Sequence, residues 1–109
     1  MIIKMTVEII SGEEHLTAVL CGELDHHTAA AARELIDARL ERSTPKLCIM
    51  DMAGITFMDS SGIGLILGRQ RVMEGYGGSV KVKNPSRYAD KIIRLAGLEG
   101  MIIPEKCKV

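Results

Sequence analysis

Two adjacent serines beside an aspartate are the residues of this chain best placed to do chemistry. The run Asp59-Ser60-Ser61-Gly62 follows an apolar stretch typical of a buried strand and precedes one typical of a helix. The serines are therefore expected at a helix N-terminus, where free backbone N–H groups and the helix dipole favour negative charge. Such a position suits a hydroxyl that gains and loses a phosphate. The structural alternative is that Asp59 or Ser60 only caps the helix.

A second polar segment, Asp25-His26-His27, comes directly after another strand-like stretch. Binding sites in open α/β sheets form where the carboxyl ends of the strands face one edge. The topology therefore predicts that this segment approaches residues 59–61. Thr28 is expected to cap the helix that follows, and Asp25 has the alternative role of capping it together with Thr28.

Enzymatic chemistry finds little support in these residues. Ser60, His26 and Asp25 are the residue types of a hydrolase triad, but an adjacent Asp and His rarely adopt the geometry that a triad requires. Neither a G-x-S-x-G elbow nor a phosphate-binding GxxxxGK[ST] loop occurs. Neighbouring histidines in an extended loop tend to point apart, which makes metal binding a poor explanation. We therefore predict no catalytic residue, no metal site and no cofactor.

Composition predicts one α/β domain with an aliphatic core. The chain has 109 residues, of which 47% are hydrophobic, yet it contains one Phe, two Tyr and no Trp. Its 14 basic and 14 acidic residues cancel, which argues against direct nucleic-acid binding. Three separated cysteines fit a reducing cytosol. A signal-peptide pattern and a run of about 20 apolar residues are both missing, so a cytoplasmic protein without membrane contact is expected.

The apolar stretches predict a chain of order ββαβαβαβ, with a mixed, mostly parallel sheet of four or five strands and three helices. Strands are expected at 2–10, 15–22, 46–52, 79–83 and 101–103, and helices at 29–42, 61–75 and from Asn84 or Ser86 to about 96. The unbroken apolar run at 46–52 indicates a strand buried on both faces. Residues 104–109 are expected to be a short tail, either disordered or forming one turn.

Small and basic residues follow the serines along the expected helix. Gly62, Gly64 and Gly68 each cost roughly 1 kcal/mol in a helix relative to Ala, so they need a reason. Close packing is expected for Gly68, whereas Gly62 is expected to leave the serine backbone accessible. Arg69 and Arg71 form a basic cluster that is usually a solvated face, with binding of an acidic partner as the alternative.

Two blocks of sequence, Gly-Glu-Leu-Asp-His-His-Thr-Ala at 22–29 and Phe-Met-Asp-Ser-Ser-Gly-Ile-Gly at 57–64, together resemble a STAS domain. They are similar in particular to the sporulation-type anti-sigma factor antagonists of Gram-positive, spore-forming bacteria. The segments Ile-Leu-Gly-Arg at 66–69 and Leu-Ala-Gly-Leu at 95–98 extend the similarity over nearly the whole domain. The resemblance implies a single STAS domain over residues 1–109 that acts as a monomer.

The resemblance also implies a regulatory cycle. In this family the antagonist binds an anti-sigma factor that is a serine kinase, and the sigma factor is released. The kinase then uses ATP to phosphorylate the antagonist, which dissociates, and a serine phosphatase restores it. The alternative is a STAS module of another kind, such as a stress-signalling scaffold or a small-ligand sensor.

The family's phosphoacceptor serine corresponds to Ser60, with Ser61 as the alternative. The residues that the resemblance assigns to partner binding are Asp25, His26, His27, Thr28, Asp59, Ser61, Gly62, Gly64 and Arg69.

Overall fold

The computed structural model describes residues 3–104, which form a four-stranded mixed sheet with three helices. The elements in chain order are β1 (Met5–Ser11), β2 (His15–Leu24), α1 (His26–Ser43), β3 (Leu47–Met58), α2 (Ser60–Gly75), β4 (Ser79–Lys83), α3 (Arg87–Leu95) and the 3-10 helix η1 (Glu99–Met101). The strands lie in the order β1-β2-β3-β4, with an antiparallel β1–β2 pair and two parallel pairs. The predicted α/β class is confirmed.

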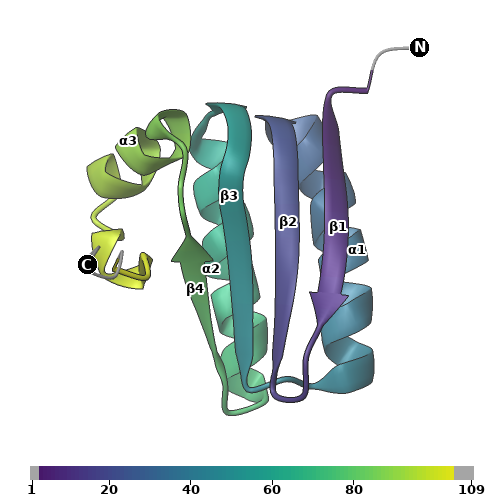
Figure 1. The fold of residues 1–109 in the computed structure, drawn as a ribbon. Coiled ribbons are helices and arrows are strands. Elements are labelled where there is room, and N and C mark those ends of the chain that lie inside the picture. Colours follow the sequence, from purple (N-terminus) through teal and green to yellow (C-terminus); the bar gives the residue numbers. More distant parts are fainter. Residues whose placement is uncertain (1–2, 105–109) are drawn as a thin grey trace, which may run out of the picture.

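The helices α1 and α2 cover one face of the sheet. Figure 1 shows α1 behind β1 and β2 and α2 behind β3 and β4, while α3 and η1 lie beyond β4. The core fills the space between the sheet and these two helices. Its buried side chains include Leu16, Ala18, Leu20, Met50 and Val82 from the strands and Ala32, Ile36, Leu40, Ile66 and Met73 from the helices. Burying each Leu or Ile contributes about 1.5–3 kcal/mol, so this layer is the main source of stability.

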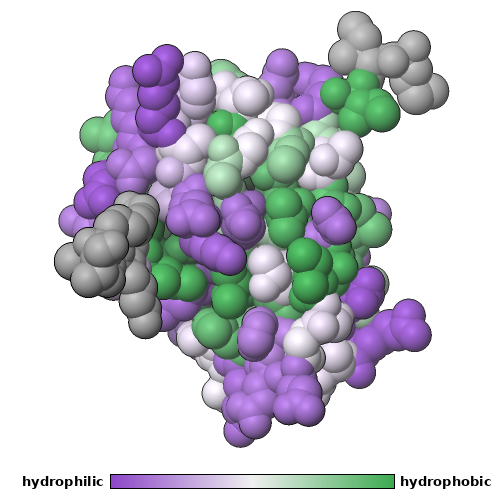
Figure 2. Space-filling model, in the orientation of Figure 1, coloured by the Kyte–Doolittle hydropathy of each residue, from purple (hydrophilic) through white to green (hydrophobic). Residues whose placement is uncertain are grey.

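No helix within residues 3–104 covers the opposite face of the sheet (Figure 1), so the prediction that strand 46–52 is buried on both faces is wrong. Burial alternates along β3: Cys48 and Met50 are buried beneath the helices, whereas Ile49 and Asp51 are partly exposed. Figure 2 shows this face as apolar residues interrupted by polar ones. The unbroken apolar run arose because large apolar residues also occupy the half-exposed positions.

The strand β3 runs six residues further than predicted, and this extension carries the chain to the serines. Ile55, Thr56 and Phe57 are β-branched or aromatic residues that favour strands. Gly54 allows the close pairing with β2, because a Cβ at this position would lie 2.5 Å from the Sγ of Cys21. The register shifts along this stretch and ends with Leu24 opposite Met58.

The predicted fifth strand at 101–103 is wrong. Residues 99–101 form η1 instead, and a single parallel bridge joins Ile102 to Val82. The β4 strand has its predicted bounds, and Ser86, one of the two predicted caps, is the N-cap of α3. The expectation for the tail falls mostly on residues 105–109, outside the described part of the chain. None of the helices within residues 3–104 has the length and apolar character of a membrane span.

Candidate functional site

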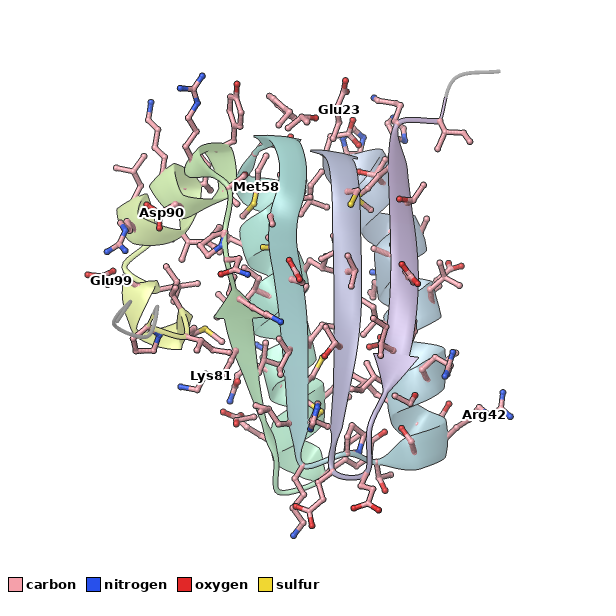
Figure 3. All side chains as sticks on the ribbon, viewed as in Figure 1. Glu23, Arg42, Met58, Lys81, Asp90 and Glu99 are labelled. Carbon is pink, nitrogen blue, oxygen red and sulfur yellow. The ribbon has the colours of Figure 1, made fainter. Side chains whose placement is uncertain are left out.

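The two polar segments singled out in the sequence meet at one edge of the sheet, as predicted. Leu24 at the end of β2 pairs with Met58 at the end of β3, and the Asp59 N–H donates to the Leu24 carbonyl at 3.3 Å. Figure 3 shows Glu23 and Met58 at this edge. The N-termini of α1 and α2 are therefore neighbours.

The N-terminus of α2 presents Ser60 to solvent. Asp59 is the N-cap, and its Oδ1 accepts a hydrogen bond from the Ser61 N–H at 2.8 Å. Ser60 is the first residue of the helix and is exposed, whereas Ser61 is half-buried. The side-chain hydrogen bonds within residues 3–104 include none from the Ser60 hydroxyl. Of the two predicted caps, Asp59 holds the position and leaves the Ser60 hydroxyl accessible.

The N-terminus of α1 is held by a capping box, which corrects the predicted start of this helix. Asp25 is the N-cap, and its Oδ1 accepts from the N–H groups of His27 and Thr28, both at 3.0 Å. In return, the Thr28 Oγ1 accepts from the Asp25 N–H at 2.9 Å. The helix thus begins at His26 rather than Ala29, because Asp25 takes the capping position and Thr28 supports it from inside the first turn.

Lys4 neutralises the Asp25 carboxylate, and sequence reasoning missed this residue. Its Nζ lies 2.7 Å from the Asp25 Oδ2 and 3.9 Å from a Glu23 carboxylate oxygen. The hydrogen bond from Lys4, together with that from the Thr28 backbone, holds the pKa of Asp25 well below its usual range, and Asp25 raises the pKa of Lys4. The pairing depends on the β1–β2 register, which also lets the Glu23 N–H donate to the Lys4 carbonyl at 2.7 Å.

The two histidines occupy the first turn of α1 and are exposed. Their ring centroids are 4.1 Å apart with 35° between the ring planes, so the expectation that the side chains point apart is wrong. The helical backbone, in place of the extended loop that was assumed, brings the rings together. Residues 3–104 contain no group of three or more His, Cys, Asp or Glu side chains that could hold a metal ion.

The expected roles of two glycines are reversed. Gly62 is buried, and a Cβ at this position would lie 2.6–2.8 Å from side-chain atoms of Met58. A Cβ at Gly68 or at the exposed Gly64 would meet no atom within 4 Å. Gly62 therefore serves packing of α2 against the end of β3, while Gly64 and Gly68 leave open space beside the helix.

Arg69 is buried, so its interpretation as part of a solvated face is wrong. The residue is 5% exposed, and its Nε lies 2.7 Å from the Oδ1 of Asp37 on α1, as an ion pair rather than an aligned hydrogen bond. Burial lowers the pKa of Arg69, an effect that Asp37 opposes and the charge of Arg33 reinforces. The ion pair joins α1 to α2, while Arg71 remains exposed.

Two exposed apolar residues near Ser60 were also missed. Phe57, just before the serines, is 46% exposed, and Leu67 on α2 is 44% exposed. Ser60, Gly64, Leu67 and Arg71 follow one another at helical spacing and are all exposed. Because Leu67 follows Ser60 at helical spacing, the sequence could have indicated that the two residues share one face of the helix. Together, Ser60, Gly64 and Leu67 form what we call the acceptor face.

The comparisons with known proteins agree with this architecture. Residues 6–108 match the STAS domain family. A protein of Lysinibacillus sphaericus described as an anti-sigma F factor antagonist is 42% identical over 79 residues, which cover 72% of this chain and 68% of that protein.

Two solved structures extend the similarity to three dimensions. The anti-sigma factor antagonist SpoIIAA in its unphosphorylated form has a TM-score of 0.82 at 30% identity, with 93% of this chain and 89% of the other covered. The Bacillus cell fate determinant SpoIIAA in its phosphorylated form has a TM-score of 0.74 at 30% identity, with 93% and 92% covered. The chain therefore belongs to the STAS domain family, where it groups with anti-sigma factor antagonists.

Proposed function

We propose that the unphosphorylated protein binds an anti-sigma factor with serine kinase activity, and that this binding releases the sigma factor. Phosphorylation of Ser60 then ends the interaction, and a serine phosphatase restores it. The observation that carries this proposal is the exposed Ser60 hydroxyl at the first position of α2, beside the N-terminus of α1. The existence of unphosphorylated and phosphorylated forms of the relative SpoIIAA supports it.

The acceptor face supplies a contact surface for this partner. Leu67 presents apolar area further along α2 from Ser60, and Gly64 leaves the α2 backbone uncovered between these two residues. Exposed apolar side chains next to a modifiable hydroxyl suit an interface that a single charge disrupts. The predicted partner-binding residues His26 and His27 lie on the neighbouring N-terminus and extend the same edge.

A phosphate on Ser60 explains release without unfolding. It adds a charge of about −1.5 to −2 near neutral pH, which the N-terminus of α2 offsets in part. Asp59 adjoins Ser60 in sequence, and Asp25 caps the neighbouring helix, where Lys4 already neutralises its carboxylate. The fold therefore tolerates the phosphate, whereas a partner that covers Ser60 must desolvate this charge at a cost of several kcal/mol.

Phosphosite mapping tests the proposal. The full chain is incubated with the anti-sigma factor of the same organism and ATP, and the modified residue is identified by mass spectrometry. We expect stoichiometric phosphate on Ser60 and its removal by the serine phosphatase. Phosphate on Ser61 alone would reassign the acceptor, and a chain that is neither bound nor phosphorylated would refute the proposed cycle.

A further inference from the structure

A groove of about 350 Å³ runs between α1 and α2, beginning beside the acceptor serine. Its small lining residues are Ala29 and Ala30 from α1 and Gly64 and Gly68 from α2. Added Cβ atoms at both glycines would meet no atom of the described residues within 4 Å, so the groove has room for a side chain from outside. His26 and Ser61 line it close to the sheet edge where the two helices start.

Two guanidinium groups line this groove, and a single carboxylate balances them. Arg33 is exposed on α1, and Arg69 is 5% exposed on α2. Asp37 pairs with the Arg69 Nε, but the hydrogen bonds within residues 3–104 include none from the two Nη nitrogens of Arg69. The groove therefore carries an excess of about one positive charge, and the two Nη nitrogens of Arg69 are donors that remain available to a carboxylate.

We propose that this groove receives an acidic side chain, Asp or Glu, from the anti-sigma factor. The inference rests on the proposed function and adds the chemistry of one contact. A carboxylate suits the site better than a phosphate, because one further negative charge neutralises the Arg33–Arg69–Asp37 group. The groove is also continuous with the acceptor face through Gly64, so a partner seated on Ser60 reaches it without a second interface.

Four forms of the full chain test this contact through their affinity for the anti-sigma factor of the same organism. Arg33→Glu supplies an internal carboxylate beside Arg69 and repels an incoming one. Gly68→Leu fills the groove, and it should fold because the site has space and Leu is the better helix former. Arg42→Glu is the matched charge control, since Figure 3 shows Arg42 at the opposite end of α1.

We expect calorimetric titration to show binding at least about tenfold weaker for Arg33→Glu and Gly68→Leu, and within about twofold of wild type for Arg42→Glu. Thermal unfolding should show that Gly68→Leu is at least as stable as wild type. Failure of the wild-type chain to bind would overturn the proposed function and this contact with it. Normal binding by both groove variants would overturn this contact alone.

Two further outcomes identify a different occupant. Weaker binding by Gly68→Leu but not by Arg33→Glu would mean that an apolar segment enters the groove, which overturns the carboxylate assignment. Self-association of the wild type in sedimentation experiments that both groove variants abolish, with anti-sigma factor binding intact, would show that a second copy of this chain occupies it.

Discussion

The N-termini of α1 and α2 lie side by side and are both capped by an aspartate, yet they differ in how firmly their side chains are held. Asp25 takes part in a capping box with Thr28 and an ion pair with Lys4. Asp59 makes a single capping bond to the Ser61 N–H and leaves the Ser60 hydroxyl exposed. The first end is held by several side-chain contacts, whereas the second leaves a hydroxyl exposed.

Under the proposed function, this difference combines rigidity with a switch at one edge. Phosphorylation of Ser60 would gain from a neighbouring helix end that does not move, because a kinase requires the hydroxyl in a defined position. The Asp59 N–H donates to the Leu24 carbonyl, so the acceptor loop is tied to the segment that leads into the α1 capping box. The comparison predicts that loss of the Ser60 hydroxyl alters function, whereas loss of the Asp25 charge alters stability.

The largest functional effect is expected for Ser60→Ala. Phosphate incorporation should fall to background, while the anti-sigma factor still binds. Because Asp59 and not Ser60 is the cap, the free energy of unfolding should change by no more than about 0.5 kcal/mol. Radiolabel incorporation and urea unfolding measure these quantities. Ser61→Ala is the control, and retention of phosphorylation by Ser60→Ala but not by Ser61→Ala would move the acceptor by one residue.

Paired glycine substitutions on α2 sharpen the distinction between packing and open space. Gly62→Ala forces a Cβ against the buried Met58 and should lower the free energy of unfolding by about 1 kcal/mol or more. Gly68→Ala meets no neighbour and should raise it by about 0.5–1 kcal/mol, since Ala is the better helix former. Urea denaturation measures the free energy of unfolding of both variants. Equal changes in this free energy would contradict the assignment of packing to Gly62 and open space to Gly68.

The smallest effect is expected for Asp25→Asn at the fixed end. Asn still caps α1, but it loses the ion pair to Lys4, so the Tm should fall slightly at pH 7. The pKa of Asp25 is lowered in the folded state, so its charge stabilises the fold above the unfolded pKa of about 3.9, and this gain disappears as pH falls further. Tm values of variant and wild type should therefore converge toward pH 2.

Phosphorylation of Asp25→Asn should stay near the wild-type rate, because the Asp25 carboxylate of the wild type is already paired with Lys4. The rate is measured with the same kinase preparation as for Ser60→Ala. A several-fold change in this rate with an unaltered Tm would mean that Asp25 belongs to the functional end of the comparison.

The sequence was sufficient for the features that depend on order and spacing. Alternating apolar stretches predicted the α/β class, and parallel pairing predicted that residues 25–27 and 59–61 would meet. Contacts between individual residues could not be predicted from the sequence. Lys4 and Asp25 are 21 residues apart in sequence and meet only through the β1–β2 register. The apolar run of β3 did not reveal which face lacks a helix.

The neighbours of individual α2 residues also could not be inferred. Gly62 and Gly68 look equivalent in sequence, and Met58 alone makes one a packing position. Arg69 carries a charged side chain of the kind usually found at the surface, but α1 covers it and supplies Asp37 as its partner. Both errors have the same origin, because helical periodicity says which residues share a face and not what that face contacts.

The affinity of the anti-sigma factor for the chain with and without phosphate on Ser60 tests the central claim most directly. The two forms are prepared by kinase treatment and phosphatase treatment of the same sample and compared by calorimetric titration. We expect the phosphorylated form to bind at least about a hundredfold more weakly, because the partner must desolvate the phosphate, with an unchanged circular dichroism spectrum. Equal affinities for the two forms would contradict the account.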